Sequence, residues 1–510
     1  MLSDEALEAT RPRHPAASSL ADLAAWLAEH AGGFRSRGDL AVTATGVSLS
    51  SQRVRPGDVY AALPGGRAHG IDYAAAAVQS GAVAVLTDET GADRAPQVPL
   101  LVVERPRAVL GRFAARVYGE PAASLRMVGV TGTQGKTTTT RLMESGLQEA
   151  GVSSAAIGTV GTRVAGVDVK TKLTTPEAPD LHALFALMRE RGVDACAMEV
   201  SSHALVMGRV DGVVFDVAVF TNLGRDHLDF HADVEDYFAA KAGLFTPERA
   251  RLGLVNVDDP YGRRLVDEAT IPVHTYSATG QDADWRAIDV ESTATGSSFT
   301  IIGPKGESVP AGVPLPGGFN VSNALAAVAA CAEAGYEPAR IAAGVAGGGG
   351  VPGRFERVDE GQDFVVVVDY AHKPDAVEAA LATLRPLTEG RVIVVLGAGG
   401  DRDPGKRPIM GEIAARLADV LVVADDNPRT EDPAAIRKAL LDGALGGGAH
   451  VVEIGDRRLA IREALGRARP GDIVLVAGKG HETGQEVAGV THAFDDRVEL
   501  RKALEEVTGT

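Results

Sequence analysis

Cysteine, aromatic residues and blocks of positive charge are scarce in this sequence of 510 residues. Its two cysteines, Cys196 and Cys331, stand in apolar segments, which favours buried thiols over a disulfide or a metal pair. No lysine-arginine block stands out and the net charge is -17 at pH 7, which argues against nucleic acid or an anionic membrane as the main partner. Any anionic ligand is therefore expected at a local site.

Long apolar runs are missing as well. None approaches the length of a membrane span, and the N-terminal sequence MLSDEALEATRPRHP is acidic and broken by proline, unlike a signal peptide. These features predict a cytoplasmic protein that does not insert into a membrane. The length exceeds what one hydrophobic core usually supports, so several domains are expected.

Alternating strand and helix patterns predict an α/β protein with three domains. Residues 1–122 carry short strands such as GDVYAALP and GAVAVLTD, separated by helical stretches such as DYAAAAVQSG. Residues 123–350 contain the apolar strands DACAMEV, GVVFDVAVF and ARLGLVNV, which are typical of a parallel sheet covered on both faces. The glycine-rich residues 346–353 predict a hinge or linker before the third domain, residues 351–510.

Four apolar strands follow the linker: DFVVVVD, RVIVVLG, DVLVVAD and GDIVLVAG. Each opens directly into a polar loop: DYAHKPD, AGGDRDPGKR, DNPRTED and KGHETGQ. Ligands of open parallel sheets bind beyond the carboxyl ends of the strands. The sequence therefore predicts a ligand site in these loops.

The strongest single motif is GTQGKTT, between the strand MVGV and the helical stretch TTTRLMESGLQEAG. Glycines let backbone N–H groups approach phosphate, Lys136 neutralises the terminal phosphates, and the Thr137 hydroxyl can bind magnesium. Val130 stands where the usual spacing has a glycine, but the flanking strand and helix favour a nucleotide site over a chance glycine turn. The motif consists of Gly132, Thr133, Gln134, Gly135, Lys136, Thr137 and Thr138.

Other polar residues have an ordinary and a functional interpretation. Glu199 ends a strand and His227 follows another, so the two could hold magnesium. The ordinary alternative is an N-cap network for Asp226 and a hydrogen-bonded loop histidine for His227. Lys241, in the helical stretch EDYFAAKAGLF, would ordinarily be a solvated surface lysine. Arg354 and Asp369 could reach the nucleotide from the third domain when the domains close.

The DNPR loop raises the same question. Asp425, Asp426, Asn427 and Arg429 arrive together after a buried strand. Asp, Asn and Pro are common turn residues, so a solvated turn is one interpretation. A recognition loop is the other, because an arginine pairs with a carboxylate while Asp and Asn can hold an amine.

Nine motifs occur in order over nearly the whole chain: GTQGKTT, MEVSSHAL, FTNLGRDHLDFH, LPGGFNVSNALAA, VPGRFE, DYAHKPDA, GGDRDPGKRP, DNPR and GKGHE. This set resembles the Mur ligase superfamily, in particular the branch that adds the third residue of the peptide. The resemblance implies an N-terminal UDP-binding domain, a central ATP-binding domain with a phosphate loop, and a C-terminal Rossmann-like domain. It also implies ATP-dependent addition of meso-diaminopimelate to UDP-N-acetylmuramoyl-L-Ala-D-Glu, through an acyl phosphate, in peptidoglycan precursor synthesis.

The resemblance also implies roles for residues at matching positions. For ATP these are the GTQGKTT loop, Asn323, Arg354 and Asp369. For magnesium they are Thr137, Glu199, His227 and Lys241, the last as a carbamate. For the UDP-sugar dipeptide they are Leu49, Ser51, Gly66, Arg67, Ala68, Thr174, Thr175, Ser201, Met207 and Arg209. For diaminopimelate they are Arg402, Asp426, Asn427, Pro428, Arg429, Gly478 and Glu482.

Two positions depart from the family pattern: Gln52 replaces a common arginine, and Met207 stands where a polar contact residue can occur. In the DNPR loop, Arg429 favours diaminopimelate over lysine, because the far end of diaminopimelate carries a carboxylate as well as an amine. The alternatives are a lysine-adding ligase, a folylpolyglutamate synthase, a P-loop switch or motor ATPase, and a non-catalytic binding protein. A monomer is expected.

Overall fold

The computed structural model describes residues 10–508. The prediction that the N-terminal sequence is not a signal peptide falls mostly on residues 1–9, which lie outside the described residues. Within residues 10–508 no helix is long and apolar enough to cross a membrane. The chain forms two compact units. The first runs to Arg286 and includes Ile301–Val309 and Asn323–Val345; the second comprises Ala287–Thr300, Pro310–Ser322 and the chain from Ala346 onward.

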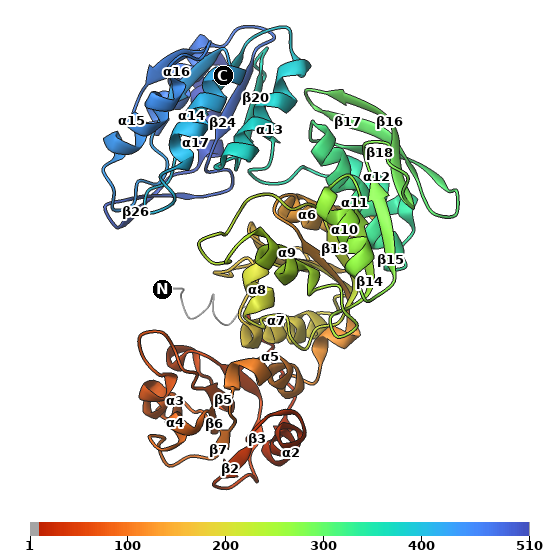
Figure 1. The fold of residues 1–510 in the computed structure, drawn as a ribbon, viewed down its shortest axis with the longest axis vertical. Helices are drawn as coiled ribbons and strands as arrows, with labels where there is room; N and C mark the ends of the chain where they lie inside the picture. Colours follow the sequence, from red (N-terminus) through yellow and green to blue (C-terminus); the bar gives the residue numbers. More distant parts are fainter. Residues whose placement is uncertain (1–9, 509–510) are drawn as a thin grey trace. The chain divides into compact units, whose positions relative to one another are not determined.

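The N-terminal domain is built on a five-stranded sheet in the order β2-β7-β6-β5-β4 (Figure 1). β4 to β7 are parallel and β2 runs antiparallel to β7. One face packs on α2 and α5 through residues such as Val59, Leu86 and Phe113. The strands are β1 (Ser18–Ser19), β2 (Arg35–Arg37), β3 (Thr43–Ala44), β4 (Gly46–Ser48), β5 (Asp58–Ala61), β6 (Ala84–Thr87) and β7 (Leu100–Val102). The helices are α2 (Leu20–His30), α3 (Ala74–Gln79), α4 (Glu89–Ala92) and α5 (Pro106–Val117), with 3-10 turns η1 (Ser51–Arg53), η2 (Gly70–Tyr73) and η3 (Pro121–Ser124).

The central domain confirms the parallel sheet predicted from its apolar strands. β9, β12, β8, β13, β14 and β15 lie in that order and are all parallel. Strand order reverses at β8, with β12 on one side and β13 on the other, so the loop after β8 lies at the point where such sheets bind ligands. The bounds are β8 (Arg126–Thr131), β9 (Ser154–Gly158), β12 (Ala195–Glu199), β13 (Phe215–Phe220), β14 (Ala250–Asn256) and β15 (Val273–Ser277).

The remaining elements between residues 126 and 347 are a hairpin beside the sheet, seven helices and three further strands. β10 (Gly161–Val164) and β11 (Val167–Val169) form a hairpin beside β9. The helices are α6 (Lys136–Glu149), α7 (Ala178–Glu190), α8 (Ser202–Val206), α9 (Val234–Ala242), α10 (Pro260–Glu268), α11 (Gly318–Glu333) and α12 (Pro338–Gly347). Further strands are β16 (Trp285–Thr293), β17 (Gly296–Ile302) and β18 (Ser308–Val313). The predicted linker begins inside α12, which ends at Gly347.

The C-terminal sheet has the order β19-β20-β24-β21-β22-β23, parallel except for β19. The four strands predicted from the sequence are present as β20 (Val365–Asp369), β21 (Val392–Leu396), β22 (Val420–Val423) and β24 (Ile473–Ala477). A fifth parallel strand, β23 (His450–Glu453), was missed, because this edge strand has no fully buried residue and lacks a continuous apolar run. The short strands β19 (Glu356–Arg357), β25 (Gly484–Val487) and β26 (Val490–Ala493) were missed too.

Helices cover this sheet in two groups. α14 packs against α13 and α15, and α16 packs against α17 (Figure 1). Alternate strand residues, such as Val366 and Val368, share a core with Ile461 and Leu500 of the second group. The bounds are α13 (Pro374–Leu384), η4 (Arg385–Leu387), α14 (Lys406–Leu417), α15 (Pro433–Ala444), α16 (Arg457–Arg467) and α17 (Asp496–Thr508).

Candidate active site

The GTQGKTT loop joins β8 to the N-terminus of α6. Gly132 and Gly135 have φ angles of 144° and 86°, a region that favours glycine. A Cβ atom on Gly132 would clash with Thr221 Oγ1, and one on Gly135 would clash with Asn323 Oδ1. Two glycines of the predicted phosphate loop are therefore required by the backbone and its neighbours.

Hydrogen bonds hold this loop in one shape. The backbone N–H groups of Thr133 and Gln134 donate to the backbone oxygen and Oδ1 of Asn222, both at 2.9 Å. Lys136 Nζ donates to the carbonyls of Gly132 at 2.7 Å and Thr133 at 3.0 Å, so the ammonium lies over the loop. With α6 beginning at Lys136, its first N–H groups add to a positive potential suited to phosphate.

Glu199 and Lys241 are both buried beside the loop. Glu199 ends β12 and pairs with Val130 of β8, and its carboxylate accepts from Thr159 N at 2.7 Å and Thr159 Oγ1 at 3.1 Å. Lys241 is only 1% exposed, so the surface-lysine interpretation is wrong. Its Nζ donates to the Gly132 carbonyl at 2.8 Å, because α9 packs its buried face towards the loop.

His227 lies in the loop after β13, with a left-handed φ of 53°. Its backbone N–H donates to Asp226 Oδ1 at 2.9 Å, and its Nε2 lies 3.3 Å from Asp226 Oδ2. The ring is 4.8 Å from the ring of His203 and 6.0 Å from that of Tyr237. Within residues 10–508 no group of three or more His, Cys, Asp and Glu side chains is arranged to hold a metal ion.

Several residues predicted to bind the dipeptide form one hydrogen-bonded set with Glu199. Thr174 Oγ1 lies 3.1 Å from Thr159 Oγ1, which in turn donates to the Glu199 carboxylate. Thr175 Oγ1 donates to the Glu199 carbonyl at 2.8 Å and accepts from Ser201 N at 3.2 Å. The structure thus places Thr174, Thr175 and Ser201 against the predicted magnesium ligand.

Arg209, also predicted to bind the dipeptide, is held by a carboxylate. Its Nε donates to Glu177 Oε1 at 2.8 Å, and Arg107 of α5 donates to Glu177 Oε2 at 2.7 Å. Glu177 lies immediately before α7, and it was not among the predicted site residues. This carboxylate therefore links the N-terminal domain to a predicted substrate-binding arginine.

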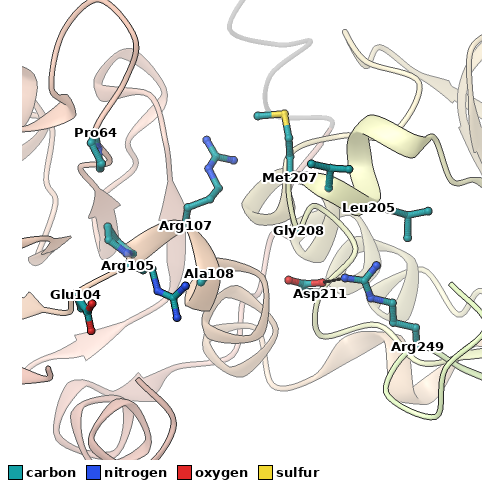
Figure 2. Close-up of a pocket in the computed structure, with 12 residues that line it drawn as sticks. Pro64, Glu104, Arg105, Arg107, Ala108, Leu205, Met207, Gly208, Asp211 and Arg249 are labelled. Atoms are coloured by element: carbon teal, nitrogen blue, oxygen red, sulfur yellow. Dashed lines mark hydrogen bonds and ion pairs between the residues drawn. The ribbon is translucent and has the colours of Figure 1, made fainter. Parts of the chain in front are cut away.

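Met207 lines a pocket of about 480 Å³ between the loop after β7 and the end of α8 (Figure 2). Arg105, Arg107 and Arg249 contribute to its wall, and Arg249 pairs with Asp211 at 2.9 Å. The other residues predicted for the UDP end lie at the carboxyl ends of two adjacent parallel strands, β4 and β5. They are Leu49, Ser51, Gly66, Arg67 and Ala68.

The residues predicted to meet ATP lie in both units. In the first, Asn323 accepts from Thr139 Oγ1 at 3.4 Å and abuts Gly135. In the second, the Arg354 guanidinium lies 4.6 Å over the Tyr370 ring, and its buried Nε has no hydrogen-bond partner in the described part of the chain. Burial raises the pKa of the Asp369 carboxyl, although Arg354 and the Phe355 N–H at 2.9 Å oppose that change.

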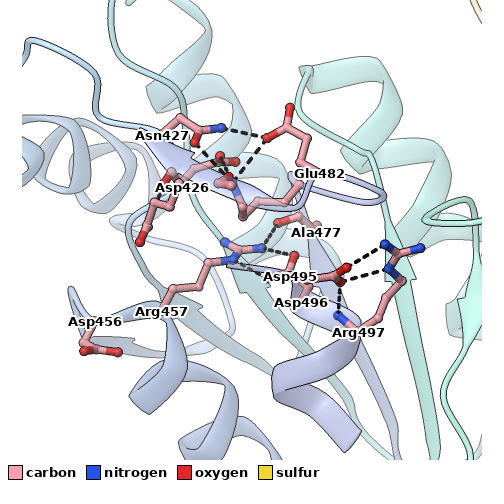
Figure 3. A network of polar contacts seen from close by, with 12 residues as sticks. Asp426, Asn427, Asp456, Arg457, Ala477, Glu482, Asp495, Asp496 and Arg497 are labelled. Atoms are coloured by element: carbon pink, nitrogen blue, oxygen red, sulfur yellow. Dashed lines mark hydrogen bonds and ion pairs between the residues drawn. The ribbon is translucent and has the colours of Figure 1, made fainter. Parts of the chain in front are cut away.

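The loops after β22 and β24 meet at the predicted amino-acid site (Figure 3). Asn427 Nδ2 donates to Glu482 Oε2 at 2.8 Å. A Cβ atom on Gly478 would lie only 2.5 Å from Asp426 Oδ2, so glycine lets that carboxylate approach the backbone. The structure therefore brings Asp426, Asn427, Gly478 and Glu482 together.

Arg429 lies further along the same loop, after Pro428, with a φ of 54°. Its Nη1 donates to the Gly400 carbonyl at 2.6 Å, and its Nε lies 3.6 Å from Glu486 Oε2. Arg402 follows Gly400 in the loop after β21 and is exposed. The two arginines predicted for this site are thus carried by neighbouring loops.

Sequence reasoning missed two buried cations beside these loops. Lys479, in the GKGHE motif, is fully buried and contacts Asn427 and Glu482; its place between two glycines at a strand end was the available signal. Arg457 at the start of α16 is fully buried and donates to Asp496 at 2.7 and 2.8 Å. No feature of the sequence around Arg457 marks it.

Comparison with known proteins agrees with this arrangement. Residues 43–118 match the Mur ligase family catalytic domain, residues 130–331 the Mur ligase middle domain, and residues 353–480 the Mur ligase glutamate ligase domain. Proteins of Streptomyces avermitilis and Streptomyces coelicolor named "UDP-N-acetylmuramoyl-L-alanyl-D-glutamate--2,6-diaminopimelate ligase" are each 56% identical over 98% of this chain and 99% of their own. A solved structure of a protein with that name is 34% identical, covers 93% of this chain and 97% of its own, and superposes with a TM-score of 0.67.

These proteins share more with this chain than the fold alone. The similarity spans almost the full length of both Streptomyces proteins at more than half identity. The three matched regions fall on the three α/β domains described above, in the same order. The chain therefore belongs to the Mur ligase family.

Proposed function

We propose that this protein is an ATP-dependent amide ligase that adds meso-diaminopimelate to UDP-N-acetylmuramoyl-L-Ala-D-Glu in the cytoplasm. The observation that carries the proposal is the acceptor site, where Asp426 and Glu482 offer carboxylates to an amine while Arg429 offers a guanidinium to a carboxylate. The names of the Streptomyces relatives support the same substrates. Since every named site comes from one chain, a monomer is sufficient.

Each domain has a proposed role. Residues 1–122 bind the UDP end of the substrate, residues 123–350 bind ATP, and residues 351–510 bind the amino acid. The UDP end is proposed to bind at Leu49, Ser51 and the Gly66–Ala68 loop. The pocket lined by Met207 and Arg105 also includes Pro64, close in sequence to that loop, and supports an anionic sugar nucleotide on this side. Thr174, Thr175, Ser201 and Arg209 then hold the dipeptide beside Glu199.

The proposed reaction has two steps. An oxygen of the D-glutamyl γ-carboxylate attacks the terminal phosphorus of ATP, and ADP leaves with the electron pair of the broken P–O bond. The acceptor amine then attacks the acyl carbon, phosphate leaves with the C–O electron pair, and the amine loses a proton. Phosphorylation is needed because a carboxylate is a poor electrophile until one of its oxygens becomes a good leaving group.

The phosphate loop supplies the electrostatics of the first step. Lys136 lies over the loop, and the first N–H groups of α6 point to the same place. Arg354 and Asp369 are proposed as nucleotide contacts from the C-terminal domain on the resemblance to the family. Such preorganised donors stabilise charge that develops on a transferring phosphoryl group.

Magnesium is proposed at the same loop. Thr137 offers a hydroxyl and Glu199 a buried carboxylate oriented by Thr159, and oxygen donors suit a hard cation. His227 is the less typical ligand, and Lys241 would contribute as a carbamate. Bound magnesium would neutralise charge on the phosphates. Intact mass of gently purified protein tests the modification: absence of the added carbon dioxide mass, with activity unaffected by its depletion, contradicts it.

Arg429 supports diaminopimelate over lysine. A guanidinium forms a charge-assisted hydrogen bond with the far carboxylate of diaminopimelate, and it repels the ammonium of lysine because both are positively charged. The pairing of a UDP-sugar site with this loop favours the cell-wall substrate over a folate.

Oxygen-18 in the D-glutamyl γ-carboxylate tests the acyl phosphate. The expected result is one labelled oxygen in the phosphate released during diaminopimelate addition. Product formation with unlabelled phosphate would refute this mechanism. ATP hydrolysis at full rate without the UDP substrate would instead support the switch or motor alternative.

A further inference from the structure

Lys479 is the one residue between Gly478 and Glu482 whose side chain carries a positive charge, and it is 0% exposed. Its Nζ donates to the Gly484 carbonyl at 2.6 Å and to Asn427 Oδ1 and Glu482 Oε2, both at 3.2 Å. Asp426 Oδ1 lies 3.9 Å away. An ammonium has three donors, so these contacts use all of them and fix the side chain.

These contacts also determine which way the Asn427 amide faces. Asn427 Oδ1 accepts from Lys479 Nζ and from the backbone N–H of Glu486 at 2.9 Å. Both partners can only donate, so this atom must be the carbonyl oxygen. The amide nitrogen then donates one hydrogen to Glu482 at 2.8 Å and carries a second hydrogen that a ligand can accept. Asn427 is thereby prepared to donate to a carboxylate.

The same cluster sets the charge of the site. Asp426 and Glu482 are two carboxylates, and Lys479 is the cation that contacts both. The buried Arg457 is neutralised by its two hydrogen bonds to Asp496. At neutral pH the side chains of Asp426, Glu482 and Lys479 therefore sum to one negative charge, which matches the single ammonium at the far end of a diamino dicarboxylic acid, while Arg429 carries a separate positive charge for its carboxylate.

We propose that Lys479 is a positioning residue for the amino-acid acceptor, which orients Asn427 and Glu482 and limits the net charge of Asp426, Glu482 and Lys479 to minus one. This proposal deepens the proposed function and rests on it. Without Lys479 the cluster would carry two negative charges, which attract an acceptor that ends in an ammonium alone and repel one that also carries a carboxylate. Lys479 thus assists Arg429 in selecting diaminopimelate over lysine.

Two substitutions separate the charge of Lys479 from its hydrogen bonds. Lys479→Gln keeps N–H donors and removes the charge, whereas Lys479→Met removes both. Lys438→Gln is the matched control, because Lys438 is 73% exposed and pairs only with Asp442 within residues 10–508, on the outer surface of α15. For each variant, kcat and KM are measured for diaminopimelate, lysine and ATP, and folding is checked by thermal unfolding.

The expected result is a KM for diaminopimelate about tenfold higher in Lys479→Gln, as for loss of one charge-assisted contact. The KM for ATP should stay unchanged, and the ratio of kcat/KM for diaminopimelate to that for lysine should fall. Adding Glu482→Gln to Lys479→Gln returns the charge to minus one and should recover part of that ratio. A purely structural role would not produce this recovery.

Several outcomes would overturn the role of Lys479. One is an unchanged ratio of kcat/KM for diaminopimelate to that for lysine in Lys479→Gln. Another is an equal rise in the KM for ATP and the KM for diaminopimelate. If Lys479→Met does not fold, Lys479→Gln decides, and failure of both to fold would make Lys479 a structural residue. A wild-type protein that forms no product with diaminopimelate would refute the proposed function itself. A wild-type protein that uses diaminopimelate, with Lys479 variants that keep the wild-type selectivity, would refute only the role of Lys479.

Discussion

The buried pair of Arg457 and Asp496 provides a sharp test of how the C-terminal domain is held together. Both side chains are 0% exposed, and the guanidinium donates to both carboxylate oxygens, at 2.7 and 2.8 Å. Burial alone would lower the pKa of Arg457, but the charge and hydrogen bonds of Asp496 outweigh it and raise that pKa. Asp496→Asn therefore leaves a charged guanidinium buried without its counterion, which we expect to cost about 3–5 kcal/mol.

An exposed pair on the same two helices is the control. Arg462 of α16 and Glu506 of α17 form an ion pair of 2.7 Å, with side chains 44% and 60% exposed. Glu506→Gln should cost no more than about 1 kcal/mol, because solvent screens the pair. Replacing both members of the buried pair, as Arg457→Met with Asp496→Leu, should recover much of the loss by removing both charges.

Hydrogen exchange is the appropriate assay, because a protein of several domains does not unfold in a single two-state step. Opening free energies are measured for amides of residues 457–467 and 496–508 in the full-length protein. The account is refuted if Asp496→Asn changes them no more than Glu506→Gln does. Arg457 Nη2 also donates to the Ala477 carbonyl at 2.9 Å, so Asp496→Asn should loosen the start of the acceptor loop as well.

Three further predictions follow from the sites. Arg429→Ala should raise the KM for diaminopimelate about tenfold or more, as for a lost charge-assisted contact, with little change in the KM for ATP; equal loss of both would contradict its assignment. Gly135→Ala should raise the KM for ATP, because the left-handed φ costs about 1–2 kcal/mol and the added Cβ displaces Asn323; unchanged kinetics would count against the loop geometry. His182, fully buried with Nε2 3.0 Å from the Asp211 carbonyl, has a pKa lowered by burial to about 4. Its contribution to stability is complete above the unfolded pKa of about 6.5 and is lost as pH falls towards 4, by up to about 3 kcal/mol, so His182→Gln should flatten the pH dependence of the unfolding free energy.

The sequence predicted those elements whose signals are local. The four C-terminal strands were found because each is an apolar run that ends in a polar loop, and the phosphate loop because its glycines and Lys136 lie between a strand and a helix. Edge strand β23 was missed because it pairs with only one strand and none of its four residues is buried. A local sequence pattern therefore predicts an element only where the burial of its side chains shows as a continuous apolar run within that segment.

Contacts between distant segments could not be predicted from the residues alone. Lys241 is buried because α9 packs against the loop after β8, a contact between positions 109 residues apart. One hydrogen-bond partner of Lys479, Asn427, lies in a loop 52 residues earlier, so its role depends on β22 and β24 presenting their ends at one edge of the sheet. The resemblance to a family supplied residue roles, but it assigned none to Glu177 or to Lys479.

The most direct test of the central claim is phosphate release from ATP with UDP-N-acetylmuramoyl-L-Ala-D-Glu, measured without an acceptor, with L-lysine and with meso-diaminopimelate, alongside the mass of the product. The account predicts release that depends on diaminopimelate, with one tripeptide product formed per phosphate. Preference for lysine would contradict the role given to Arg429, and phosphate release without any peptide product would contradict the ligase assignment.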